Sequence, residues 1–197
     1  MDENRRDKGG KEREDRTVER VKTHPPKHHI LVKKDEIRFA LITVSDSRYK
    51  MLLKGEEVKD LTAEVVSKIL KDEGCKLVFY EVVPDDLLKI RKVTLKVIDE
   101  ESPDVLILSG GTGITERDVT VEAVSPLLDK RLTGFEVIFH LKSYEKVGNA
   151  TVLSRSIAGL CKKTIIFVLP GSPNAVSMAL NEIIMPEVEH LVSMAIS

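Results

Sequence analysis

The sequence predicts an α/β fold with a largely parallel sheet, because short apolar runs alternate with longer segments of helical periodicity from about residue 38 onward. Pro, Gly and Asp follow several of these runs and mark where the expected strands end. A chain of 197 residues, of which 42% are hydrophobic, can bury one sizeable core. We therefore expect one domain over residues 36–197, preceded by a charged N-terminal extension over residues 1–35.

The expected strands and helices follow one another in βαβ order. Four apolar runs are typical of buried strands, at residues 39–44, 77–83, 105–108 and 164–169. Apolar residues at helical spacing predict helices over about residues 58–70, 87–98, 121–124, 135–147 and 174–184. Gly74 and Gly148 fall where two of these helices would end, and Pro186 would kink or split the last, which Ser172 and Asn174 are suited to cap. Residues 158–163 fit a short antiparallel strand and turn.

The N-terminal extension is unlike the rest of the chain. Residues 1 to about 27 are mostly Lys, Arg, Asp and Glu with hardly an apolar side chain, so we expect this segment to be mobile. His24, His28 and His29 lie in a polar stretch stiffened by proline and without partner carboxylates. This setting favours a solvated arm, or one that packs on a neighbouring subunit, over a metal site.

Charge and cysteine content bound the partners and the compartment. The 31 Lys and Arg residues nearly cancel the 32 Asp and Glu residues, so no global field predicts nucleic acid or an acidic membrane as a partner. Cys75 and Cys161 lack CxxC spacing and are interpreted as buried or incidental thiols. Because neither a signal peptide nor a long apolar run is present, we expect a cytoplasmic protein.

The most informative segment joins an apolar strand directly to a loop of small residues. Residues 106–108 run into Ser109-Gly110-Gly111-Thr112-Gly113, and Arg117 and Asp118 follow closely. Glycines let backbone N–H groups approach a ligand, and they permit the positive φ angles that turn successive amides toward one point. The segment therefore predicts an anion site, to which Arg117 adds a fixed positive charge and Asp118 a carboxylate suited to a hard cation.

Spacing excludes two familiar phosphate-binding motifs. A P-loop needs Lys and then Ser or Thr after its second glycine, whereas Gly113 is followed by Ile114-Thr115. The dinucleotide-binding fingerprint has glycines at its first, third and sixth positions, and the sixth position counted from Gly111 is Glu116. The plainer alternative is a tight strand-to-helix turn that binds nothing.

Four polar loops follow the expected parallel strands at their carboxyl ends. They are Ser45-Asp46-Ser47-Arg48, Asp85-Asp86, Ser109 to Asp118, and Pro170-Gly171-Ser172-Pro173. In open α/β sheets ligands bind beyond these ends, where the loops and the helix N-termini share one crevice. We therefore expect the four loops to form one site.

Several of these side chains also fit purely structural roles. Asp85 is well placed as a helix N-cap, a role compatible with ligand binding. Asp118 is suited to cap the short helix that follows, but Thr120 is an equally good cap and would leave the Asp118 carboxylate free. Ser154-Arg155-Ser156 offers a guanidinium and two hydroxyls suited to phosphate, or a solvated surface trio.

Six short segments, taken together and in this order, resemble the MoaB/Mog family of molybdenum cofactor biosynthesis. They are Thr43-Val44-Ser45-Asp46, Val83-Pro84-Asp85-Asp86, Ser109-Gly110-Gly111-Thr112-Gly113, Arg117-Asp118-Val119-Thr120, Leu153-Ser154-Arg155 and Leu169-Pro170-Gly171-Ser172-Pro173. The resemblance extends over about residues 37–194. It implies the molybdopterin-binding fold, a three-layer α/β/α sandwich with a mostly parallel central sheet, and assembly as a homotrimer or homohexamer.

The resemblance also implies an activity and its residues. Active members of the family adenylylate molybdopterin: the terminal phosphate of the pterin attacks the α-phosphate of ATP, pyrophosphate leaves, and the product passes on to metal insertion. Asp85 and Asp118 match the family's two essential aspartates, which serve Mg²⁺ and the nucleotide. The expected substrate-binding residues are Ser45, Asp46, Ser109, Gly110, Gly111, Thr112, Gly113, Arg117, Ser154, Arg155, Pro170, Gly171, Ser172 and Pro173.

Two alternatives stand beside catalysis, namely a non-catalytic molybdopterin-binding or carrier protein and a structural oligomer with a degenerate site. Retention of both Asp85 and Asp118 favours catalysis, because pterin binding alone needs no pair of carboxylates, and the intact glycine loop argues against a degenerate site. One departure is Asp60-Leu61-Thr62, where the family often has an Asp-x-Gly or Asp-Ser-Gly turn. Molybdenum and tungsten are both compatible with the sequence.

Overall fold

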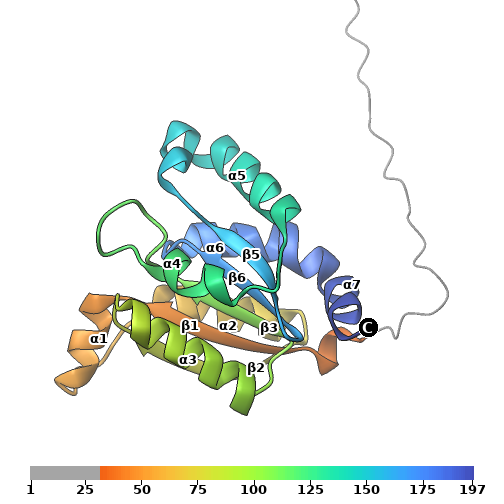
Figure 1. Ribbon diagram of the computed structural model, residues 1–197, viewed down its shortest axis with the longest axis horizontal. Helices are drawn as coiled ribbons and strands as arrows, with labels where there is room; N and C mark the ends of the chain where they lie inside the picture. Colours follow the sequence, from red (N-terminus) through yellow and green to blue (C-terminus); the bar gives the residue numbers. More distant parts are fainter. Residues whose placement is uncertain (1–31) are drawn as a thin grey trace, which may run out of the picture.

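The computed structural model describes residues 32–197 and contains one six-stranded sheet in the order β2-β1-β3-β6-β5-β4 (Figure 1). The strands are β1 (Arg38–Val44), β2 (Lys76–Val83), β3 (Val105–Ser109), β4 (Lys130–Arg131), β5 (Ile157–Cys161) and β6 (Thr164–Leu169). The first four in spatial order are parallel, β5 pairs antiparallel with β6, and β4 pairs antiparallel with β5. The predicted α/β class with a mostly parallel sheet is confirmed.

The central strands form where the apolar runs predict them. Every residue of β3 and β6 is buried, as is typical of parallel strands covered on both faces. Leu41 pairs with Ile107 and Ile107 with Phe167, so the three strands are in register across the middle of the sheet. The antiparallel strand expected at residues 158–163 is β5 and the turn after it.

Alternate residues along the strands face two separate cores. Leu41, Ile107 and Phe167 pack in one core, and their neighbours Ile42 and Leu108 pack in the other. The first core is covered by α2 (Leu61–Asp72), α5 (Thr133–Val147), α6 (Pro173–Ala179), η4 (Leu180–Ile184) and α7 (Met185–Ile196), and the second by α3 (Leu87–Glu100) and α4 (Thr120–Val124). Figure 1 shows α3 in front of the sheet and α2 behind it. The three-layer sandwich is therefore confirmed. Within residues 32–197, no helix is long and apolar enough to span a membrane.

The helix ends agree with the sequence in part. Gly74 and Gly148 follow α2 and α5 with positive φ angles of 77° and 63°, as predicted. The last helix is interrupted over η4, a π-helical turn just before Pro186, because proline lacks an N–H and its ring clashes with the preceding turn. Ser172 occupies the N-cap position of α6, but its side chain makes no capping hydrogen bond, so the predicted side-chain cap is wrong. Pro173 starts that helix instead, through its fixed φ.

The segment after β1 differs from its predicted loop. Ser45 is the N-cap of α1 (Asp46–Leu53), and its Oγ accepts a hydrogen bond from the N–H of Arg48 at 3.4 Å. None of the α1 residues is buried, so the segment has no apolar stripe from which a helix could be predicted. Asp46 therefore stands at a helix N-terminus.

Most of the predicted N-terminal extension, including His24, His28 and His29, lies outside the described residues. Its last part contacts the domain near the C-terminus. The N–H of Val32 donates to Ser193 Oγ at 3.1 Å. The short helix η1 (Lys34–Glu36) follows, and Lys34 Nζ lies 2.5 Å from Glu73 Oε2 at the end of α2.

Candidate active site

The loops after β1, β3 and β6 meet beyond the middle of the sheet. β3 leads to α4 on one face, whereas its two neighbours β1 and β6 lead to α2 and α6 on the opposite face. Such a reversal of direction opens a crevice at the carboxyl ends of the strands. Two of the polar loops join there through Ser109, whose Oγ donates to the carbonyl of Pro170 at 3.2 Å.

Asp46 and Asp85 tie the loops after β1 and β2 together. The N–H of Asp46 donates to Asp85 Oδ2 at 2.8 Å, and the N–H of Asp85 donates to Asp46 Oδ1 at 3.1 Å. Burial raises the pKa of Asp85 above its ordinary value, and the negative charges of Asp46 and Asp118 act in the same direction, against the opposing effects of the hydrogen bond and of Arg117. Asp85 is thus a partly buried carboxylate beside two others.

The predicted capping role of Asp85 is wrong, because α3 begins one residue later than such a cap requires. Asp86 is the N-cap, and its Oδ1 accepts a hydrogen bond from the N–H of Lys89 at 2.9 Å. The carboxylate of Asp85 lies instead against the glycine loop, where a Cβ added to Gly111 would be 3.3 Å from Asp85 Oδ1.

Gly110 and Gly111 occupy positions that other residues fit poorly. Their φ angles are 112° and 62°. A Cβ on Gly110 would lie 2.2 Å from the carbonyl oxygen of Val44, and one on Gly111 would lie 2.3 Å from Thr120 Oγ1. The loop therefore lies directly on the end of β1 and the start of α4, with Asp85 beside it.

Asp118 closes the other end of the same loop. Its Oδ2 accepts hydrogen bonds from the N–H and the Oγ1 of Thr115, at 2.9 and 2.6 Å. A Cβ on Gly113 would lie 2.7 Å from the same oxygen. Burial acts to raise the pKa of Asp118, but the hydrogen bonds from Thr115 and from the backbone of Gly113, together with the positive charge of Arg155, lower the pKa below the ordinary value. The carboxylate thus stays ionised next to the glycines.

Neither Asp118 nor Thr120 caps α4, contrary to both predictions. The N-cap position is Val119, because Asp118 turns back to Thr115 and Thr120 is already the first helical residue. The N–H of Thr120 donates to the carbonyl of Gly111 at 3.1 Å. Its hydroxyl is buried and has no hydrogen-bond partner among the described residues.

The two arginines near the loop have different surroundings. Arg117 is exposed, and among the described residues it has no hydrogen-bond or ion-pair partner. Arg155 contacts the loop from the segment just before β5: Nε donates to the carbonyl of Gly113 at 2.7 Å, and Nη2 donates to that of Asp118 at 2.8 Å. It also pairs with Glu122 of α4, which the sequence did not single out.

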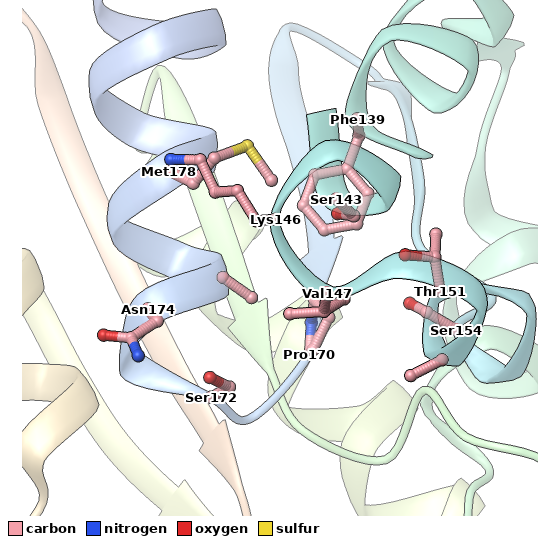
Figure 2. Close-up of a pocket in the computed structure, with 12 residues that line it drawn as sticks. Phe139, Ser143, Lys146, Val147, Thr151, Ser154, Pro170, Ser172, Asn174 and Met178 are labelled. Atoms are coloured by element: carbon pink, nitrogen blue, oxygen red, sulfur yellow. The ribbon is translucent and has the colours of Figure 1, made fainter. Parts of the chain in front are cut away.

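Ser154, Pro170 and Ser172 line a pocket of about 270 Å³ next to the crevice. Figure 2 shows Thr151 and Ser154, at the end of η3 (Gly148–Leu153), across this pocket from α6. The hydroxyl of Thr151 is buried and, within residues 32–197, has no hydrogen-bond partner. The apolar part of the lining comes from Phe139, Val147, Ala150, Ala175 and Met178. These residues come from segments that meet only in the folded chain, so no spacing in the sequence marks them.

A second carboxylate network supports the site from behind. Asp60, almost fully buried, is the N-cap of α2, and its Oδ2 accepts a hydrogen bond from the hydroxyl of Tyr80 at 2.8 Å. Thr62 Oγ1 donates to the carbonyl of Gly171 at 3.0 Å and so holds the loop after β6. Burial acts to raise the pKa of Asp60, but hydrogen bonds and the nearby charge of Arg48 lower it overall. The Asp60-Leu61-Thr62 departure from the family pattern is therefore a capping motif.

The donor set at the loop fits a divalent cation held together with a substrate. Within residues 32–197, no group of three or more His, Cys, Asp or Glu side chains comes together to hold a metal. Mg²⁺ usually keeps several waters and is bound by one or two carboxylates plus substrate phosphates. Asp85 provides hard oxygen ligands, and a cation would offset the burial and the like charges that raise its pKa.

The chain is similar over most of its length to proteins of molybdenum cofactor biosynthesis. It is 43% identical over 155 residues to the "Probable molybdopterin adenylyltransferase" of Methanocaldococcus jannaschii, which covers 79% of this chain and 91% of that protein. It is 41% identical over 157 residues to "Molybdenum cofactor biosynthesis protein B" of Bacillus cereus, with 79% and 89% covered.

A solved structure agrees with these relatives. The tungsten cofactor synthesizing protein MoaB from Pyrococcus furiosus superposes with a TM-score of 0.71 at 38% identity, covering 88% of this chain and 100% of that one. Residues 40–190 match the family model described as "Probable molybdopterin binding domain". The resemblance to the MoaB/Mog proteins is confirmed, and the chain belongs to the molybdopterin-binding domain family.

Proposed function

We propose that the protein is a molybdopterin adenylyltransferase, which acts with ATP and Mg²⁺ and releases pyrophosphate. The observation that carries this proposal is the position of two carboxylates on one glycine loop, with Asp85 against Gly111 and Asp118 against Gly113. The name of the Methanocaldococcus relative supports the same activity. A carrier that only binds the pterin has no need of a carboxylate pair at a phosphate-binding loop.

The loop has the groups that phosphoryl chemistry needs, because such transfer depends mainly on positioning and on neutralising charge. The N–H of Gly110 is bonded to the carbonyl of Leu169, but those of Gly111 and Thr112 have no acceptor within residues 32–197 and are available to a phosphate. Arg117 would add its unpaired positive charge. When bound, Mg²⁺, which Asp85 would help to hold, would offset part of the negative charge of the phosphates.

The two aspartates would have different roles, because their environments differ. Burial and neighbouring carboxylates raise the pKa of Asp85. Its ionised form would therefore be stabilised most by a cation at its oxygens. Asp118, whose pKa is lowered, supplies an ionised carboxylate that Thr115 holds in place. The pocket beside Ser154, Pro170 and Ser172 would receive the organic part of a substrate next to these groups.

We further propose assembly as a homotrimer or homohexamer, transfer of the product to a metal-insertion enzyme, and a cytoplasmic location. No nucleic acid or membrane partner is proposed, because the charges balance across the chain. The Pyrococcus relative is described as a tungsten cofactor synthesizing protein, which supports tungsten as well as molybdenum as the eventual metal.

The test is pyrophosphate release from ATP and Mg²⁺ with and without molybdopterin. We expect release that depends on the pterin, and a loss of at least about 100-fold in Asp118→Ala and in Asp85→Asn while the fold is kept. Asp86→Asn is the matched control, since it removes the same charge one residue away and Asn caps a helix as well as Asp. Unchanged turnover in Asp118→Ala would contradict its role, and pterin binding without turnover in the wild type would identify a carrier.

A further inference from the structure

We infer that Arg155 is a positioning residue for adenylyl transfer: its guanidinium holds the segment that carries Asp118 against the glycine loop, and it does not bind phosphate itself. This inference rests on the proposed function and assigns Arg155 a different task from the phosphate binding that the sequence predicts.

Arg155 contacts the segment 112–118 at both of its ends. Its backbone N–H donates to the carbonyl of Thr112 at 3.0 Å, and its Nε donates to that of Gly113 at 2.7 Å. Its Nη2 donates to the carbonyl of Asp118 at 2.8 Å. One side chain thus joins the start of the exposed turn to the residue that ends it.

The guanidinium of Arg155 is already paired with a carboxylate of the protein. Nη1 forms an ion pair with Glu122 Oε1, and Nη2 lies 3.3 Å from Glu122 Oε2. The hydrogen bond from Arg155 lowers the pKa of Glu122, which keeps this partner ionised. Four of the five guanidinium N–H groups therefore already have partners in the protein. Arg117 on the same loop is exposed and unpaired within the described residues, so it is the freer of the two arginines to bind a phosphate.

The segment held in this way has little other support. Residues 114–117 are all exposed, and the hydrogen bonds between Thr115 and Asp118 lie within the turn itself. Contacts that tie the turn to the rest of the domain come from Arg155 and from the N–H of Thr120. Loss of the guanidinium would therefore let Asp118 shift relative to Asp85, and a shift of about 1 Å in a catalytic group can cost about 100-fold in rate.

Lysine does not reproduce this arrangement. Arginine presents five donors in a planar fork that reaches two carbonyls and a carboxylate at once, whereas lysine concentrates its donors at one atom. A residue that served only as a positive charge for phosphate would tolerate Lys. A residue that positions Asp118 through the fork would not.

The experiment compares Arg155→Ala and Arg155→Lys with the wild type in pterin-dependent pyrophosphate release, recording kcat, the KM values and the Mg²⁺ concentration that gives half-maximal rate. Arg131→Ala is the matched control, because Arg131 forms a similar fork with Glu136 at 2.9 and 3.0 Å on the exposed strand β4. We expect both Arg155 variants to lose about 10- to 100-fold in kcat and to need more Mg²⁺, with the pterin KM little changed. Guanidinium ion, added well below denaturing concentrations, should restore part of the rate of Arg155→Ala.

Two results would overturn the inference: a large rise in the KM for ATP or molybdopterin at unchanged kcat, or recovery of full activity in Arg155→Lys. If Arg155→Ala does not fold, Glu122→Gln takes its place, because it weakens the ion pair but keeps the packing. This variant should also lower kcat, by a smaller factor than the loss expected for Arg155→Ala. Amide hydrogen exchange over residues 112–118 gives a readout without turnover. It should be faster in Arg155→Ala and unchanged in Arg131→Ala, and equal protection in all three proteins would reject the inference even if the wild type proves to be a carrier.

Discussion

Gly113 offers a way to displace the Asp118 carboxylate without straining the backbone. In Gly113→Ala the added Cβ would lie 2.7 Å from Asp118 Oδ2 and 3.0 Å from its Cγ, so the side chain must swing aside. Unlike Gly110 and Gly111, Gly113 does not have a positive φ, so a Cβ there brings no left-handed backbone strain. Losing the hydrogen bonds to Thr115 lowers the free energy of unfolding by about 1 kcal/mol. Alanine reduces the conformational freedom of the unfolded chain, which raises the free energy of unfolding by about 0.4–1 kcal/mol.

The expected outcome of Gly113→Ala is an enzyme of nearly normal stability and low activity. The free energy of unfolding should change by less than about 1 kcal/mol, because the two effects nearly cancel. The rate of pterin-dependent pyrophosphate release should fall by about 100-fold, since displacing a catalytic group by about 1 Å has this effect. Calorimetric Tm and the release assay, run on the same preparation, separate the two effects.

Two other glycines provide the controls. Gly110→Ala combines a positive φ of 112° with a Cβ 2.2 Å from a backbone oxygen of Val44. Strain of about 1–3 kcal/mol and overpacking of about 1–3 kcal/mol should lower its Tm by on the order of 10 °C. Gly134→Ala in α5, where an added Cβ meets no atom of the described residues within 4 Å, should keep the rate and leave Tm unchanged or a few °C higher. Full activity in Gly113→Ala, or a Tm loss equal to that of Gly110→Ala, would refute the reasoning.

The remaining predictions concern pH and the network behind the site. Because the pKa of Asp85 is raised, its ionised form is disfavoured in the folded protein, so Asp85→Asn should raise Tm at neutral pH and the gain should vanish below about pH 4. A gain independent of pH would contradict this. Asp60, with a lowered pKa, should show the opposite: the Tm loss in Asp60→Asn should be largest at neutral pH and shrink as the pH falls below about 4, in scans over this range. Tyr80→Phe should cost about 1–2 kcal/mol in urea unfolding, through the lost hydrogen bond to Asp60, and a cost near zero would show that this bond is not stabilising.

Local patterns account for the parts of the fold that the sequence predicts well. Residues 105–109 are buried on both faces, and such strands read as continuous apolar runs. The stripe of Ile90, Thr94 and Val97 marks α3 because a helix packed on a sheet buries one face. By contrast, α1 buries none of its residues, and no periodicity marks a helix of that kind.

Helix caps show why neighbouring polar residues are hard to tell apart. Asp85 and Asp86 have identical side chains, and the sheet decides which of them caps α3 by setting where β2 ends and where the helix starts. Asp118 and Thr120 are both good capping residues, yet Val119 holds that position because the turn bonds Asp118 to Thr115. Each outcome depends on a shift of one residue in the path of the backbone.

By itself, the sequence determined the four parallel strands, the order of the loops at their carboxyl ends, the need for glycine at the motif and the family, whereas the two-residue edge strand β4 left no signal in it. These properties depend on residues close together in the chain, through apolar periodicity and backbone conformational freedom. The tertiary structure alone decided that Asp85 faces the glycine loop, that Arg155 is engaged by Gly113, Asp118 and Glu122, and that α5, η3 and α6 enclose a pocket. Those features depend on distances between segments far apart in the chain, which packing of the two cores sets.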